Sequence, residues 1–354
     1  MSITSHISAL APAKPIEVKV RDAADGLSAS DEATGPGAPA SPAEPTPFFF
    51  GAARRSGTTW LAGMLNAHPQ IECRNEGWMF NDFGASFPDW LDEARVRAWA
   101  ERTEARGTWL RDQTIDEALR AMRRAMWMAI TRKAVEREGW KRWPELRFVG
   151  DKTTSHFCLQ CDEIVRTFPD ARFLHMLRDG RDVVVSDMFL LFRELDQRDL
   201  PADARAEALA SREHHVFGKG RPVALFGPAI LRHLVSDWAG AASGGRRARE
   251  LFSNNWHEVR YECIVDRPAE ELRAILEWLG VDMEPARIEH LVGTNTFEQL
   301  SGGRSPGQED RTAEWRKGIS GDWRNHFTND DKAIFKSVAG ELLVELGYEK
   351  DLGW

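Results

Sequence analysis

The chain of 354 residues is poor in cysteine, with only Cys73, Cys158, Cys161 and Cys263. Four thiols are too few to hold a chain of this length together by disulfides, as small secreted domains are held. Cys158 and Cys161 form one Cys-x-x-Cys pair, without a second pair at the spacing of a zinc site. We therefore interpret the pair as small buried side chains on a helix rather than as a metal or redox centre.

The sequence also lacks an apolar run long enough to cross a bilayer. Its start, Met1 to His6, has neither the basic segment nor the apolar core of a secretory signal, so we expect a cytoplasmic location. Positive charge is not in excess either, since the net charge is −8. This balance excludes a general attraction for nucleic acid or anionic lipid, and any basic site must be local.

Aromatic residues are absent from residues 1–46, which are rich in Ala, Pro, Ser, Asp and Glu. Such a segment cannot bury enough apolar surface to offset the entropy lost on ordering. The whole chain is nevertheless 42% hydrophobic, which is enough for a full core. We therefore predict a disordered tail over residues 1–46 and one folded domain over residues 47–354.

Three phenylalanines, Phe48 to Phe50, begin a pattern of strand, loop and helix. They are typical of a short buried strand, and Gly51 marks the expected turn at its end. Ser56 and Gly57 then open a helix that ends before Pro69. The N–H groups of such a loop point at one spot, in line with the positive end of the helix dipole. The loop is therefore suited to bind an anion, and a phosphate group is the first candidate.

The same pattern recurs along the chain and indicates the fold class. Further strands are expected at Leu146–Val149, Ala171–Leu177 and Glu258–Tyr261, with polar loops or helices after them. Strands that alternate with helices predict an α/β fold, here a P-loop-like three-layer structure with a mainly parallel sheet flanked by helices. In such sheets ligands bind beyond the carboxyl ends of the strands, where these polar loops fall.

The segment from Gly51 to Thr58 approaches the nucleotide-binding pattern Gly-x4-Gly-Lys-Ser/Thr but differs at two positions. Ser56 replaces the second Gly and Gly57 replaces the Lys, while the cation lies earlier in the Arg54-Arg55 pair. A kinase or NTPase would need that Lys and an acidic residue for Mg²⁺ at a neighbouring strand end, where Arg178 stands. A P-loop-type kinase or NTPase and a non-catalytic nucleotide-binding module remain the alternative functions.

Three segments resemble the donor site of sulfotransferases that use 3′-phosphoadenylyl sulfate (PAPS). Arg55-Ser-Gly-Thr-Thr-Trp60 resembles their 5′-phosphosulfate loop. Arg178 to Ser186 resembles the segment in which an Arg, and a Ser eight residues later, hold the ribose 3′-phosphate. Arg316-Lys-Gly-Ile-Ser-Gly-Asp-Trp323 is similar to a near-terminal segment of the cytosolic branch that closes over the same phosphate. The resemblance covers the chain except its tail.

The resemblance implies transfer of a sulfuryl group from PAPS to a hydroxyl or an amine, with release of adenosine 3′,5′-bisphosphate. The acceptor could be a small molecule, a glycan or a peptide, and the oligomeric state is left open. Fixed cations can stabilise the leaving phosphate, so no metal is required. The donor-binding residues that the resemblance implies are Arg55, Ser56, Gly57, Thr58, Thr59, Trp60, Arg178, Ser186, Tyr261, Arg316, Lys317 and Gly318.

The base is assigned from a mixed resemblance to two branches of the family. Cys73-x-x-Glu76 is similar to the tyrosylprotein branch, in which a Glu at this spacing takes the proton of the acceptor hydroxyl. The cytosolic branch uses a His two residues after its catalytic Lys, where this chain has Thr154, and His156 lies two residues further on. Glu76 is therefore the favoured base and His156 the alternative.

The resemblance also implies roles for Lys152 and Arg55, and it bears on whether a disulfide is expected. Lys152 ends a strand as the catalytic Lys of the family does, and would neutralise charge on the leaving oxygen together with Arg55. The tyrosylprotein branch has a disulfide between a Cys near position 73 and one beside this Lys. Here Gly150 and Asp151 precede Lys152, so that disulfide is not expected. This departure favours a reducing compartment.

Overall fold

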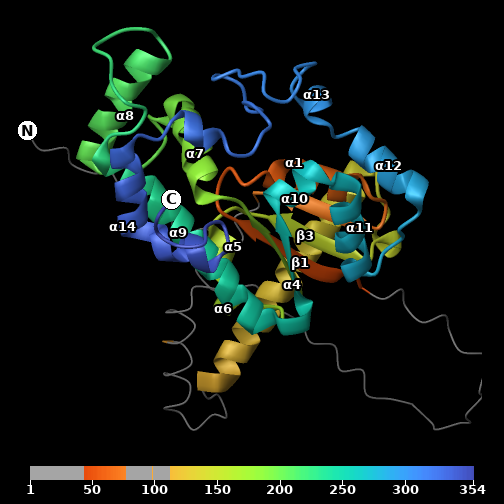
Figure 1. The fold of residues 1–354 in the computed structure, drawn as a ribbon. Coiled ribbons are helices and arrows are strands. Elements are labelled where there is room, and N and C mark those ends of the chain that lie inside the picture. Colours follow the sequence, from red (N-terminus) through yellow and green to blue (C-terminus); the bar gives the residue numbers. More distant parts are fainter. Residues whose placement is uncertain (1–43, 77–97, 99–111) are drawn as a thin grey trace, which may run out of the picture. The chain divides into compact units, whose positions relative to one another are not determined.

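The computed structural model describes residues 44–76, 98 and 112–354. Five strands form one all-parallel sheet in the order β2-β3-β1-β4-β5 (Figure 1). They are β1 (Thr46–Ala52), β2 (Ile71–Asn75), β3 (Phe148–Lys152), β4 (Arg172–Leu177) and β5 (Trp256–Arg260). The predicted α/β class is thus confirmed, with a sheet that is parallel throughout. Most of the predicted tail lies outside the described residues, and that prediction stays open.

Helices connect the strands and cover both faces of the sheet. The α-helices described are α1 (Thr58–Ala67), α4 (Asp112–Glu138), α5 (His156–Leu159), α6 (Cys161–Thr167), α7 (Gly180–Glu194), α8 (Ala202–His215), α9 (Pro228–Phe252), α10 (Tyr261–Asp266), α11 (Pro268–Leu279), α12 (Pro285–Gly293), α13 (Phe297–Leu300) and α14 (Asn329–Glu345). Short 3₁₀ turns are η2 (Trp143–Glu145), η3 (Ser253–Asn255) and η4 (Asp322–Asn325).

The central strand β1 explains the three-layer arrangement, because its side chains alternate between the two faces. Phe48 and Phe50 belong to a core cluster with α1 and α11, which includes Leu61. Phe49 points to the other side, into a cluster that includes Trp238 of α9. In Figure 1, α1, α10, α11 and α12 lie to one side of the strands, and α7, α9 and α14 lie to the other. A strand buried on both faces needs the continuous apolar run that the sequence shows.

Gly51 and Gly150 both lie inside strands, although the sequence predicted a turn at Gly51 and a strand that ends before Gly150. The chain does not leave the strand at Gly51, which pairs with His175 inside β1, so the expected turn there is wrong. A Cβ at Gly51 would lie 2.9 Å from both the Cys158 Sγ and the Phe173 ring, so the glycine serves close packing. Gly150 likewise lies within β3, where a Cβ would overlap the Phe48 carbonyl oxygen. Because Gly150 has no Cβ, β3 can approach β1 closely and continue to Lys152.

The four thiols are free, and Cys158 and Cys161 are buried on α5 and α6 as predicted. Burial raises the pKa of the Cys158 thiol far above its usual range. A thiol with a raised pKa is a poor nucleophile at neutral pH. None of the described helices combines the length and apolar character that crossing a bilayer requires.

Candidate active site

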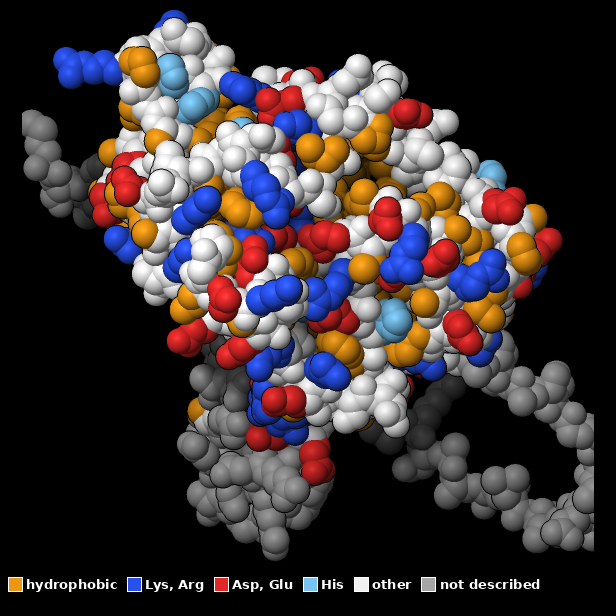
Figure 2. Space-filling model, viewed as in Figure 1, with side chains coloured by type: hydrophobic (Ala, Val, Ile, Leu, Met, Phe, Trp, Pro, Cys, Tyr) orange, Lys and Arg blue, Asp and Glu red, His pale blue; other side chains and the backbone are white. Residues whose placement is uncertain are grey.

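A residue at or after the end of each of the five strands lines one cavity of about 660 Å³ at the carboxyl edge of the sheet. This convergence follows from the topology, because parallel strands end at the same edge. Figure 2 shows cationic and acidic side chains interspersed around the hollow in the middle of this face. The residues delivered are Arg55 after β1, Glu76 after β2, Lys152 at the end of β3, Arg178 after β4 and Tyr261 after β5.

The loop between β1 and α1 has the geometry that the sequence predicts for an anion site. Gly57 caps α1 with φ at 91°, in the left-handed region that favours glycine. A Cβ at this position would lie 2.7 Å from the Tyr261 ring. Arg55 also has a left-handed backbone, with φ at 64°. The loop therefore brings the N-terminus of α1, with Thr58 and Thr59, against the cavity.

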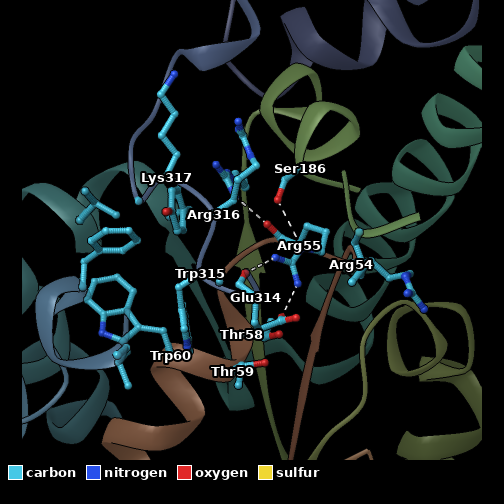
Figure 3. A pocket seen from close by; sticks show the side chains of 18 of the residues that line it. Arg54, Arg55, Thr58, Thr59, Trp60, Ser186, Glu314, Trp315, Arg316 and Lys317 are labelled. Atoms are coloured by element: carbon cyan, nitrogen blue, oxygen red, sulfur yellow. Dashed lines mark hydrogen bonds and ion pairs between the residues drawn. The ribbon is translucent and has the colours of Figure 1, made fainter. Parts of the chain in front are cut away.

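The Arg55 side chain extends from this loop towards α7, and each nitrogen of its guanidinium has a hydrogen-bond partner (Figure 3). Its Nε donates to the Ser186 Oγ at 3.3 Å. One terminal nitrogen donates to the Glu314 carboxylate at 2.5 Å, and the other donates to the Glu314 backbone carbonyl at 2.8 Å. This contact joins two residues that are 131 positions apart in the sequence, one in the loop after β1 and one on α7.

Arg178 is a buried cation whose partners are mostly neutral. Its guanidinium lies 4.0 Å from the centre of the Tyr261 ring. It donates to the backbone carbonyls of Arg55, at 2.7 Å, and Ile319, at 3.3 Å. Its Nε is buried without a hydrogen-bond partner among the described residues. A buried charge satisfied only by carbonyls is costly in free energy and attracts an anion.

The pKa of Arg178 nevertheless remains above its usual range. Burial acts to lower the pKa of the guanidinium, but the Tyr261 hydroxyl and the carboxylates of Asp182 and Glu262 outweigh burial. The Arg178 side chain is therefore charged at neutral pH.

Glu76 and Lys152 form an ion pair at the ends of the neighbouring strands β2 and β3. The Lys152 Nζ lies 2.6 Å from the Glu76 Oε1, and the Glu76 backbone N–H donates to the Lys152 carbonyl at 2.7 Å. Glu76 has φ at 53°, a left-handed conformation that is rare outside glycine and often marks functional sites. Its Oε2 is buried without a hydrogen-bond partner among the described residues. That oxygen is available to accept a proton.

Two of the predicted site residues do not line the cavity. Ser56 is fully buried beneath the loop, so only its backbone could contact a ligand. His156 begins α5, whereas Thr154, two residues earlier, lines the cavity. Every other residue predicted to bind the donor or to act in catalysis contributes to the cavity wall.

The near-terminal segment, taken here as residues 309–323, pairs Arg316 and Lys317 with carboxylates of its own. Arg316 and Lys317 both bond to Asp322, at 2.5 Å and 2.6 Å, and Arg316 also bonds to Glu309. Figure 3 shows the Lys317 side chain pointing away from Arg55. Asp182 of α7 anchors the segment, because its carboxylate accepts from the backbone N–H groups of Gly321 and Trp323.

The sequence interpretation missed the residues at both ends of the cavity. One end is apolar and includes Val265, Phe297 and Leu300, next to Trp60, whose Nε1 donates to the Asn295 carbonyl at 2.5 Å. The other end is polar and lies along α7, with Arg54, Glu194, Gln197 and Arg198. Apart from Arg54, which belongs to the loop after β1, these residues carry no motif, and only the chain path around α7, α10 and α13 brings them to the wall.

One group of described residues has the geometry of a cation site, namely Glu309, Asp322 and His326, whose ligand atoms lie within 4.8 Å of one another. Both carboxylates are already paired with Arg316, and Asp322 is also paired with Lys317. A metal ion would have to displace these cations, so the group carries no metal assignment.

A phosphate-type loop with guanidinium groups at two strand ends is typical of α/β proteins whose sites suit a phosphorylated ligand. A family profile described as "Sulfotransferase family" matches residues 47–285. The chain therefore belongs to the sulfotransferase family, an enzyme family that uses PAPS. This confirms the predicted family and the prediction that the protein is an enzyme.

Curated relatives agree with this assignment at low identity. Protein-tyrosine sulfotransferase 2 of Gallus gallus is 24% identical over 306 residues, which span 85% of this chain and 69% of that protein. Protein-tyrosine sulfotransferase of Drosophila melanogaster is 23% identical over 68% of this chain, but the match spans only 39% of its length. A crystal structure of mouse sulfotransferase SULT7A1 complexed with PAP is similar over 85% of each chain, with 16% identity and a TM-score of 0.47.

Asp322 generates a prediction about stability. Burial alone would raise the pKa of its carboxyl group, but the hydrogen bonds from His326, Lys317, Asn325 and Arg316 outweigh burial and hold the pKa well below its usual range. The side chain is only 2% exposed. We expect Asp322→Asn to lower the free energy of unfolding at pH 7 by about 1–3 kcal/mol, since it leaves partly buried cations without their carboxylate.

The pH dependence of this loss has a defined sign. A carboxyl group with a depressed folded pKa stabilises the protein above its unfolded pKa of about 3.9, and loses this effect as the pH falls below that value. Denaturant unfolding should therefore show a difference in the free energy of unfolding between the wild-type protein and Asp322→Asn. This difference should be constant above about pH 5 and become smaller towards pH 3. Asp266→Asn, at a carboxylate 83% exposed, is the control and should change stability by less than about 0.5 kcal/mol. A difference that becomes larger in acid would contradict the assignment.

Proposed function

We propose that this enzyme transfers the sulfuryl group of PAPS to an acceptor hydroxyl and releases adenosine 3′,5′-bisphosphate. The observation that carries the proposal is the position of Arg178, a buried guanidinium with neutral hydrogen-bond partners at the end of β4. A planar guanidinium with unsatisfied N–H groups is suited to bind a phosphate through charge-assisted hydrogen bonds. Ser186 of α7 adds a hydroxyl to the wall of the same cavity.

The donor fits the cavity in one direction. Its 3′-phosphate would bind Arg178 and Ser186, and its 5′-phosphosulfate would bind Arg55 and the N-terminus of α1. The adenine would lie at the apolar end beside Trp60 and Phe297, where stacking on an aromatic ring is available. This placement leaves the sulfuryl group on the side of the Glu76–Lys152 pair.

The reaction requires one proton transfer and the exchange of one S–O bond for another. The acceptor oxygen attacks sulfur, and its proton passes to the Glu76 Oε2, which has no hydrogen-bond partner among the described residues. The bond between sulfur and the oxygen bridging to the 5′-phosphate breaks, and the charge that develops on this oxygen is stabilised by Lys152 and Arg55. The Glu76–Lys152 contact, 2.6 Å long, holds base and cation in register.

The kinase or NTPase alternative conflicts with the loop itself. Its loop Lys would have to replace Gly57, where φ is 91° and a Cβ would meet the Tyr261 ring. The acceptor is defined only as a hydroxyl-bearing group, and we place it at the polar end of the cavity between Arg54 and Arg198. Arg54 points to this side in Figure 3, away from Trp60.

Donor recognition is tested with Arg178→Ala. Removal of the buried cation should weaken the binding of adenosine 3′,5′-bisphosphate at least about tenfold, since each charge-assisted hydrogen bond contributes about 1.5–3 kcal/mol. Isothermal titration calorimetry measures the change. Arg172→Ala is the matched control, because Arg172 begins the same strand at the opposite edge of the sheet. Equal affinity of Arg178→Ala and the wild-type protein would remove the 3′-phosphate from this position.

The base is tested by comparing Glu76→Gln with His156→Ala. Glu76→Gln keeps the shape of the side chain but loses its basicity, so turnover should fall by about two orders of magnitude. His156→Ala should reduce turnover much less, because His156 does not line the cavity. Both variants must keep the wild-type affinity for adenosine 3′,5′-bisphosphate for the comparison to be valid. Near-normal turnover of Glu76→Gln beside collapse of His156→Ala would move the base to His156.

A further inference from the structure

Three carboxylates of the near-terminal segment pair with the cations that the proposed function assigns to the donor. Glu314 pairs with Arg55, and Glu309 and Asp322 pair with Arg316. They differ in exposure, since the Asp322 side chain is 2% exposed and the Glu314 side chain 45%. Asp322 is therefore a buried structural partner, whereas Glu314 lies at the open cavity and can be exchanged for another anion.

Glu314 occupies the face of Arg55 that a phosphosulfate would need. Its carboxylate and its backbone carbonyl accept from the two terminal nitrogens of the guanidinium, and Ser186 takes the third nitrogen. Figure 3 shows this contact inside the cavity, above Thr58 and Thr59 at the start of α1. Withdrawal of the Glu314 carboxylate would free a terminal nitrogen of Arg55 for a charge-assisted contact with a donor oxygen.

We propose that Glu314 is an internal competitor of the donor, which pairs with Arg55 when the site is empty and is displaced by the 5′-phosphosulfate. The proposal rests on the proposed function, because it assumes that Arg55 binds the 5′ side of the donor. It assigns to Glu314 a role in ligand selection. A ligand without an anionic group at its 5′ end cannot displace the carboxylate and gains nothing from Arg55.

The Glu314 carboxylate is charged in the empty site. Burial acts to raise its pKa, but the cations of Arg55 and Arg193 outweigh burial, so the pKa lies below its usual range. A donor anion bound to Arg55 would repel the Glu314 carboxylate on the same guanidinium. Pairing of Glu314 with Arg55 therefore opposes binding of the donor.

The surroundings of Glu314 allow the exchange without unfolding the segment. Arg304 donates to the backbone carbonyls of Gln308, Trp315 and Arg316, and the Asp310 N–H donates to the Arg316 carbonyl. These bonds hold the segment independently of the Glu314 side chain. Arg193 lies 3.3 Å from the Glu314 Oε2 and is itself exposed, so the carboxylate has a second cation to turn to.

The test measures the affinity of two ligands for Glu314→Gln by calorimetry. Gln keeps an oxygen for Arg55 but removes the charge, so adenosine 3′,5′-bisphosphate should bind about tenfold more tightly than to the wild-type protein. Adenosine 3′-monophosphate lacks the 5′ group, and its affinity should stay within about twofold. Glu194→Gln is the matched control, because Glu194 lines the same cavity but pairs with Arg54. It should leave both affinities within about twofold.

The outcomes separate this inference from the function on which it rests. The competitor role is supported if Glu314→Gln binds the bisphosphate more tightly than the wild-type protein does, while its affinity for the monophosphate and both affinities of Glu194→Gln stay unchanged. Unchanged or weaker binding by Glu314→Gln, or an equal gain in Glu194→Gln or for the monophosphate, overturns that role and leaves the donor site in place. Failure of the wild-type protein to bind the bisphosphate at all overturns the proposed function and the inference with it.

Discussion

A positive charge buried beside neutral partners, on Arg178, is the constraint on which the rest of the site depends. The guanidinium is held between the Tyr261 ring and two backbone carbonyls, so its position is fixed without its charge being cancelled. The fold provides this arrangement at the junction of β4 and α7, next to the loop that follows β1. Such an arrangement is preorganised for an anion, and no side chain has to move for it to act.

The packing around Arg178 explains several residues that have no direct chemical role. Gly57 must lack a Cβ because the Tyr261 ring, which also stacks on Arg178, fills that space. Asp182 accepts from two backbone N–H groups of the near-terminal segment, and thereby ties this segment to α7 beside the cavity. The phosphate loop, the buried cation and the near-terminal segment are thus coupled by contacts between residues far apart in the sequence.

Local patterns made much of this predictable. The Phe48–Phe50 run predicted a short buried strand, and the structure places it at the centre of the sheet, where a strand covered on both faces must be apolar. The family resemblance implied that Arg55, Arg178 and Ser186 belong to one site, and contacts of Arg55 with the other two span 123 and 131 residues. The α/β class could be predicted because the alternation of strands and helices is visible in short segments.

The remaining features depend on tertiary contacts that a sequence pattern does not contain. Gly51 was expected to end a strand, but the Cys158 and Phe173 side chains across the sheet require a glycine inside it. The spacing after Lys152 left His156 as a candidate, and only the chain path through Ser155, with φ at 59°, separates Thr154 at the cavity from His156. The pairing of Glu314 with Arg55 bridges 259 residues and has no local signal.

The site is proposed to recognise a nucleotide by its 3′-phosphate, through cationic side chains that are already in place. The most direct measurement compares adenosine 3′,5′-bisphosphate with ADP, each with and without Mg²⁺, by calorimetry on the wild-type chain. We expect the bisphosphate to bind at least about tenfold more tightly than ADP, because ADP has no phosphate for Arg178. Tighter binding of ADP in the presence of Mg²⁺ would contradict a sulfuryl-donor site and favour a kinase or NTPase.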